Sequence, residues 1–114
     1  MHELSLVKSM FTSLEEEFPG RIDNLRVIYL RVGVLMDIQP ILMQNAFAAV
    51  LADEPRFAQA SLHVEVMPIK IFCEDCQKDS EVIEYRFRCS RCGKPSTKII
   101  QGEELFINKV EFEN

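Results

Sequence analysis

The sequence predicts an α+β fold in which two helices pack on a three-stranded sheet, with a cysteine-rich insert before the last strand. Three observations support this prediction: two stretches with apolar residues at helical spacing, three stretches typical of strands, and two Cys-x-x-Cys pairs close together. A chain of 114 residues suits one domain with a small insert. We expect residues 1–68 and 104–114 to form the α+β domain and residues 69–103 to form the insert.

The first helix and the first strand follow from their apolar patterns. Residues 4–18 are predicted to be helical, because apolar side chains recur every three or four residues, and Pro19 and Gly20 then end the helix. The members of this stripe are Leu4, Val7, Phe11, Leu14 and Phe18. Residues 24–35 are rich in Val, Ile, Leu and Tyr and predict a strand, with Gly33 at a bulge or close contact near its end.

The second helix and the remaining strands come next along the chain. We expect Asp37 to cap a helix that has Pro40 in its first turn and runs to about Ala52. Its predicted apolar face contains Ile41, Leu42, Ala46, Phe47, Val50 and Leu51. Residues 61–67 alternate between apolar and polar side chains and predict a half-buried strand. After Gly102 a last strand is expected, with a bulge near Asn108 where the apolar alternation shifts by one residue.

The four cysteines form two pairs, Cys73 with Cys76 and Cys89 with Cys92, separated by twelve residues. Each pair can place two thiolates on one tight turn, and two turns supply the tetrahedron of sulfurs that Zn²⁺ accepts. Gly93 follows the second pair, where such a turn often needs a positive φ. The spacing therefore predicts a zinc-ribbon domain with four cysteine ligands and no position open for catalysis. A redox pair or a disulfide is the alternative, but a redox Cys-x-x-Cys would need a βαβ setting that the pattern lacks.

The amino terminus offers a second group of metal ligands. The α-amine of Met1, the amides of His2 and Glu3, and the imidazole of His2 can converge on one ion in a plane. Planar nitrogen coordination suits Ni(II) or Cu(II) and suits Zn(II) poorly. Without further context a terminal histidine is more often a solvated side chain, and Glu3 equally suits the positive end of a helix dipole.

Charge and hydropathy argue against several classes of protein. The chain has 13 basic and 18 acidic residues, and this net charge of −5 opposes binding to nucleic acid phosphates. No apolar stretch approaches the ~20 residues that span a bilayer, and no basic segment precedes an apolar one at the start. We therefore expect a cytoplasmic protein without a membrane segment or secretory signal.

Four stretches of the sequence together resemble the HypA/HybF family of nickel metallochaperones for [NiFe]-hydrogenase maturation. They are the opening Met1–Leu6, the Leu30–Gly33 segment, the two cysteine pairs and the Gln101–Leu105 stretch. The resemblance covers essentially the whole chain, with the elements in the same order. It implies that the α+β domain binds nickel, with the ion at His2 beside the Met1 amine and the Glu3 backbone nitrogen. It also implies a structural zinc ion on Cys73, Cys76, Cys89 and Cys92.

The resemblance also implies partners for the chain. These are a HypB-type GTPase and the precursor of the hydrogenase large subunit, and in some bacteria relatives also serve urease. The chain has no G-x-x-x-x-G-K phosphate-binding loop, so nucleotide hydrolysis must come from a partner and no enzymatic activity is expected. Either a monomer or a homodimer is compatible with the sequence.

The main alternative is a zinc-ribbon adaptor that binds nucleic acid or a large protein assembly. It rests on a local basic patch around the second cysteine pair, formed by Arg86, Arg88, Arg91, Lys94 and Lys98. The net charge and the lack of interleaved aromatic residues beyond Tyr85 and Phe87 oppose binding to nucleic acid.

Overall fold

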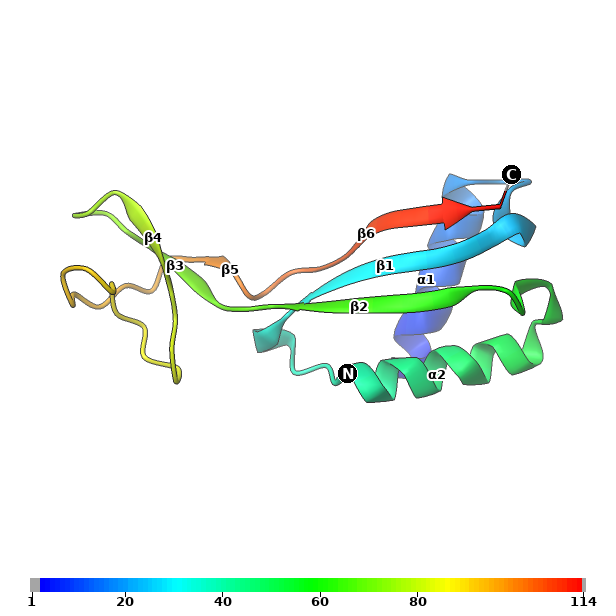
Figure 1. Cartoon of the computed structure of the whole chain (residues 1–114), viewed down its shortest axis with the longest axis horizontal. Helices are drawn as coiled ribbons and strands as arrows, with labels where there is room; N and C mark the ends of the chain where they lie inside the picture. The colour runs from blue at the N-terminus through cyan, green and yellow to red at the C-terminus, as the bar shows by residue number, and fades with distance from the viewer. Residues whose placement is uncertain (1–2, 114) are drawn as a thin grey trace. The chain divides into compact units, whose positions relative to one another are not determined.

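The computed structural model describes residues 3–113 and divides into two units (Figure 1). The first unit consists of Met1–Arg31, Ile38–Glu65 and Phe106–Asn114, and the second of Val32–Asp37 and Val66–Leu105. The second unit therefore contains the cysteine-rich insert together with the end of the first strand and the short segment after it.

The first unit contains two helices beside a three-stranded sheet (Figure 1). The helices are α1 (Glu3–Glu17) and α2 (Pro40–Asp53). The sheet has the order β2 (Ser61–Met67), β1 (Leu25–Gly33) and β6 (Leu105–Phe112). The last residues of β1 and of β2, and the first residue of β6, belong to the second unit. These elements confirm the predicted α+β fold and its order of helix, strand, helix, strand and final strand.

Aromatic side chains join the two helices in a buried core. The ring of Phe11 in α1 stacks on Phe47 in α2 at a centroid distance of 5.6 Å and on Phe57 at 4.6 Å. Burying one such side chain stabilises a fold by about 1.5–3 kcal/mol. The same core takes in the apolar side chains Val7, Met10, Leu14, Leu25, Ile28, Leu30, Met43, Val50 and Leu62.

The start of α2 differs from the prediction. Asp37 does not cap the helix: it has a φ of 54° and ends a short 3-10 turn, Val34–Met36, in the residues where the strand was expected to finish. Gln39 precedes Pro40 at the helix start. Ile41 and Leu42 are 64% and 44% exposed and do not form part of the buried face. The helix instead buries Met43, Phe47 and Val50, which follow the i, i+4, i+7 spacing of one stripe.

The second unit has a small sheet of its own, in the insert that was predicted to be a zinc ribbon, although its strands were not predicted one by one. Its order is β4 (Lys78–Glu81), β3 (Lys70–Cys73) and β5 (Ile99–Gln101). Strand β3 pairs antiparallel with both neighbours. Between residues 73 and 103 the buried side chains are Cys73, Ser80 and Cys89. The buried apolar side chains of the insert, Ile69 and Ile71, lie before Cys73, so residues 73–103 have little core beyond their cysteines.

Candidate metal centre

The four cysteines come from two turns of the second unit. Cys73 is the last residue of β3, and Cys76 lies in the turn between β3 and β4. Cys89 and Cys92 lie in a loop that is pinned by an antiparallel bridge between Arg88 and Pro95. Neither turn belongs to a helix, so each pair is positioned by backbone hydrogen bonds of a tight loop.

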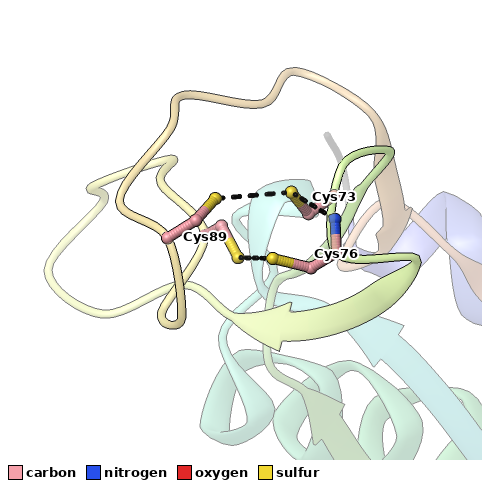
Figure 2. Close-up of side chains that lie close together, drawn as sticks. Cys73, Cys76 and Cys89 are labelled. Atoms are coloured by element: carbon pink, nitrogen blue, oxygen red, sulfur yellow. Dashed lines mark hydrogen bonds between the residues drawn. The ribbon is translucent and has the colours of Figure 1, made fainter.

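The sulfur atoms of the four cysteines converge on one point (Figure 2). All four lie within 4.8 Å of one another. The Cys73 and Cys92 sulfurs are 3.7 Å apart, and those of Cys76 and Cys89 are 3.8 Å apart. A tetrahedral zinc site with bonds of about 2.3 Å would separate its sulfurs by about 3.8 Å. The donor set and its spacing therefore fit a closed Zn²⁺ site, as the cysteine spacing predicted.

The two cysteine turns share one backbone geometry. In the first, the N–H of Gln77 donates to the carbonyl of Cys73 at 2.8 Å, and in the second the N–H of Gly93 donates to the carbonyl of Cys89 at 2.9 Å. Both of these donor residues have a positive φ, 55° for Gln77 and 77° for Gly93. The positive φ predicted for Gly93 is thus confirmed, and Gln77 occupies the corresponding strained position. The repeat of the motif itself could have revealed Gln77.

Backbone N–H groups favour the thiolate form of Cys89. The amides of Cys92 and Arg91 lower the pKa of Cys89 to about 6, and the Arg91 nitrogen is 3.4 Å from the sulfur. Hydrogen bonds from the Cys76 thiol to the sulfurs of Cys92 and Cys89 raise the pKa of Cys76 to about 12. Metal ligands must be thiolates, so loading this site releases the proton that Cys76 otherwise keeps at neutral pH.

Ser80 is a neighbour of the sulfur cluster that the sequence analysis missed. It is only 5% exposed, and its hydroxyl is 3.8 Å from the sulfur of Cys89. The same hydroxyl accepts the N–H of Ser90 at 3.1 Å and thereby ties the second cysteine turn to β4. No motif marks a serine for this role, because only the folded register of β4 brings it beside Cys89.

Most of the amino-terminal ligand group lies outside the described residues. Met1 and His2 fall there, whereas Glu3 is the first residue of α1 and is partly exposed. The basic residues of the alternative hypothesis lie on the second unit, and three of them have acidic partners nearby. Arg86 lies 3.8 Å from Glu84. Lys94 pairs with Asp75, and Lys98 lies 3.9 Å from Glu74. The hydrogen bond from Lys94 to Asp75 raises the pKa of Lys94.

Comparison with known proteins identifies the family. The family model described as "Hydrogenase/urease nickel incorporation, metallochaperone, hypA" matches residues 1–112. The chain belongs to the HypA family. Its function is therefore that of a metallochaperone in hydrogenase maturation, and it is not an enzyme.

Relatives in the HypA family match along their whole length. The hydrogenase maturation factor HypA of Aquifex aeolicus is 32% identical over 114 residues, which cover 99% of this chain and 98% of that protein. The same factor from Campylobacter jejuni is 32% identical over 111 residues, which cover 96% of this chain and 97% of that protein. The family relationship thus includes both units.

Solved structures of HypA proteins share the fold. The solution structure of the nickel metallochaperone HypA from Helicobacter pylori matches with a TM-score of 0.65 at 21% identity, over 98% of this chain and 97% of that one. A second HypA solution structure matches with a TM-score of 0.70 at 21% identity, over 99% of this chain and 97% of that one.

Within residues 3–113, no helix is both long enough and apolar enough to cross a membrane.

Proposed function

We propose that this chain binds Ni(II) at its amino terminus and delivers the ion for maturation of [NiFe]-hydrogenase, with urease as a further acceptor. One observation carries the proposal: the family match begins at residue 1 and so takes in Met1, His2 and Glu3 as well as the four-cysteine cluster. A terminal site is accessible to a partner that must remove the ion.

The proposed nickel ligands are the Met1 amine, the backbone nitrogens of His2 and Glu3, and the His2 imidazole. Backbone nitrogens lose their protons when they bind a metal ion, so nickel affinity should rise steeply with pH. Acidification or competing ligands would then release the ion.

We propose that Cys73, Cys76, Cys89 and Cys92 hold a structural Zn²⁺ ion. The sulfur spacing described above supports zinc, and four filled positions leave none for catalysis. Elemental analysis of the purified chain should give one zinc ion per chain, and Cys92→Ser should give less and unfold the second unit. A zinc content that is unchanged by Cys92→Ser would contradict this assignment.

The proposed delivery step is an exchange of ligands from this chain to a thiolate-rich acceptor. The proposed partners are a HypB-type GTPase, which would supply nucleotide hydrolysis, and the precursor of the hydrogenase large subunit. We place this exchange in the cytoplasm, since four cysteines gathered as reduced metal ligands suit a reducing compartment.

Hydrogenase activity in a bacterial strain without its own HypA tests the proposed function. Expression of this chain should restore the activity, and His2→Ala should fail to do so at low nickel. His63→Ala is the matched control, because His63 is the other histidine of the chain and is exposed on β2. Equal restoration by His2→Ala and the wild type would contradict delivery from the amino terminus.

A further inference from the structure

A strained turn stands out in the second unit, at Ile83–Arg86. The N–H of Arg86 donates to the carbonyl of Ile83 at 3.1 Å, which closes a two-residue hairpin turn. The central residues Glu84 and Tyr85 both have positive φ values, 54° and 59°, as in a type I′ turn. Such turns favour Asn-Gly, and bulky side chains in the left-handed region are unfavourable.

The same turn displays large apolar side chains to solvent. Ile83 is 69% exposed and Tyr85 is 68% exposed, ahead of the other exposed large apolar residues of the described chain. Side chains as exposed as these bury little apolar surface and therefore contribute little to the stability of the fold. A strained backbone that also exposes apolar groups indicates a role in binding rather than in stability.

An apolar cavity of about 200 Å³ lies beside this turn within the second unit. Its lining consists of Val34, Pro68, Ile69, Val82, Glu84 and Tyr85. Five of these six residues are apolar or aromatic, and Tyr85 belongs to both the turn and the cavity wall. The cavity has room for a single bulky apolar side chain next to the exposed ring.

The segment that follows the turn is positively charged, whereas Glu81 precedes the turn and Glu84 lies within it. Residues 86–98 contain five basic residues and no acidic one. Arg86 is paired only loosely with Glu84, at 3.8 Å, with side chains 78% and 75% exposed, and such an exposed pair is weak. Arg88 donates to the neutral carbonyl of Gly93 at 3.2 Å. Both guanidinium groups can therefore bind a carboxylate from outside.

We propose that the Ile83–Arg86 turn and its neighbouring cavity dock a protein segment in which one bulky apolar side chain is flanked by carboxylates. The apolar side chain fills the cavity against Tyr85, and the carboxylates meet Arg86 and Arg88. Tyrosine and arginine are the residue types that often dominate binding energy at interfaces. Charge complementarity favours an acidic segment, and the net charge of −5 opposes nucleic acid as the occupant.

Peptide titration of the full chain as purified, followed by amide NMR shifts, tests the proposal. The probe is a short peptide with one leucine between an aspartate and a glutamate, compared with peptides that carry lysine for the acids or serine for the leucine. Only the first should give saturable shifts at the cavity residues, with a dissociation constant of about 1 mM. Tyr85→Ser should weaken this binding at least tenfold. Ile100→Ser, at an exposed position of β5 outside the cavity lining, is the matched control and should bind as the wild type does.

Relief of the turn strain gives a second, independent readout. The double variant Glu84→Asn with Tyr85→Gly supplies the favoured type I′ residues, so it should raise the thermal midpoint while it abolishes peptide binding. A lower thermal midpoint would mean that Glu84 and Tyr85 stabilise the fold. Retained peptide binding would mean that these two residues do not form the docking surface. Either outcome overturns the proposal.

Other occupants are distinguished in the same titration. If a thymidine oligonucleotide shifts the cavity residues and the acidic peptide does not, the surface binds nucleic acid and the proposal is wrong. If the same shifts appear on concentration of the chain alone, the occupant is a second copy and the proposal is likewise wrong. None of these experiments contains nickel, so their outcome does not depend on the amino-terminal site.

Discussion

The backbone N–H of Gly33 donates to the carbonyl of Glu104 across 2.7 Å. The carboxylate of Glu104 in turn accepts the N–H of Gly102 at 2.7 Å, and the carbonyl of Gly102 accepts the N–H of Leu35 at 2.9 Å. These contacts join two stretches that the sequence analysis singled out separately, and they confirm the close contact expected at Gly33. A Cβ atom on Gly33 would overlap the carbonyl group of Gly102.

Gly33→Ala should therefore destabilise the chain severely. The φ of Gly33 is −69°, which alanine tolerates, so the whole effect comes from the overlap with Gly102. We expect a loss of at least about 2 kcal/mol in the free energy of unfolding, as for overpacked sites. Urea unfolding measures it. Gly93→Ala, whose Cβ would meet open space, should cost less, and an equal or larger cost there would contradict this explanation.

Gln77 and Gly93, which follow the two cysteine pairs at equivalent positions, should respond in opposite ways to substitution. Gly93→Ala places a side chain at a φ of 77° and should destabilise the second turn by about 1 kcal/mol, whereas Gln77→Gly relieves a φ of 55° in the first. Thermal unfolding with the metal bound should show a lower midpoint for Gly93→Ala and an equal or higher one for Gln77→Gly. A clear loss with Gln77→Gly would show that the Gln77 side chain matters more than its backbone.

Ser80→Ala should speed metal loss from the cysteine site. The variant removes the hydroxyl beside the Cys89 sulfur and the acceptor for the Ser90 N–H. A lost hydrogen bond of roughly 1 kcal/mol corresponds to about a fivefold faster transfer of zinc to a chelator. Ser96→Ala is the control, because the Ser96 hydroxyl donates to the carbonyl of Phe72 at 2.7 Å and so bonds to backbone rather than to a sulfur. Equal rates for both variants would exclude a specific role of Ser80.

Tyr29 should titrate at unusually high pH. Its hydroxyl donates to the Glu111 carboxylate at 2.9 Å, and this bond, with burial and the negative charge of Glu111, raises the pKa of Tyr29 above the usual 10.0. The folded state therefore favours the protonated phenol. The resulting stability is complete below a pH of about 10 and is lost as the pH rises through the folded pKa.

Glu111→Gln should lower the pKa of Tyr29 by removing the negative acceptor. The ultraviolet absorbance of tyrosinate measures it in a Tyr85→Phe background, because the chain has two tyrosines. An unchanged titration after Glu111→Gln would show that the hydrogen bond to Glu111 is not the cause of the shift.

The parts of the fold that sequence could predict are those with strong periodic patterns. The stripe of α1 and the alternation of β2 each appear in the structure close to the expected bounds, although Leu4 and Val66 at their ends are each 41% exposed. The start of α2 was misplaced because Asp37 satisfies local capping preferences, whereas the chain uses it in a left-handed turn. The individual strands of the zinc-ribbon sheet could not be placed, because a strand such as β4, with the sequence Lys-Asp-Ser-Glu, is held by backbone pairing and carries no apolar pattern.

The cysteine site was predictable for a different reason. A tetrahedral metal ion needs four ligands, and two Cys-x-x-Cys turns supply two each, so such a site is visible in the spacing of Cys73, Cys76, Cys89 and Cys92. The supporting contacts are not visible in this way. Ser80 reaches Cys89 only through the pairing of β3 with β4, so no reading of adjacent residues could have found it.

Nickel stoichiometry on a chain that begins at Met1 without a tag tests the central claim most directly. An added tag would move the amine away from His2 and remove the proposed ligand set. We predict one zinc ion per chain in the wild type, in His2→Ala and in His63→Ala, and one specifically bound nickel ion in the wild type and His63→Ala only. Equal nickel uptake by His2→Ala would contradict the amino-terminal site and would favour a zinc-ribbon adaptor instead.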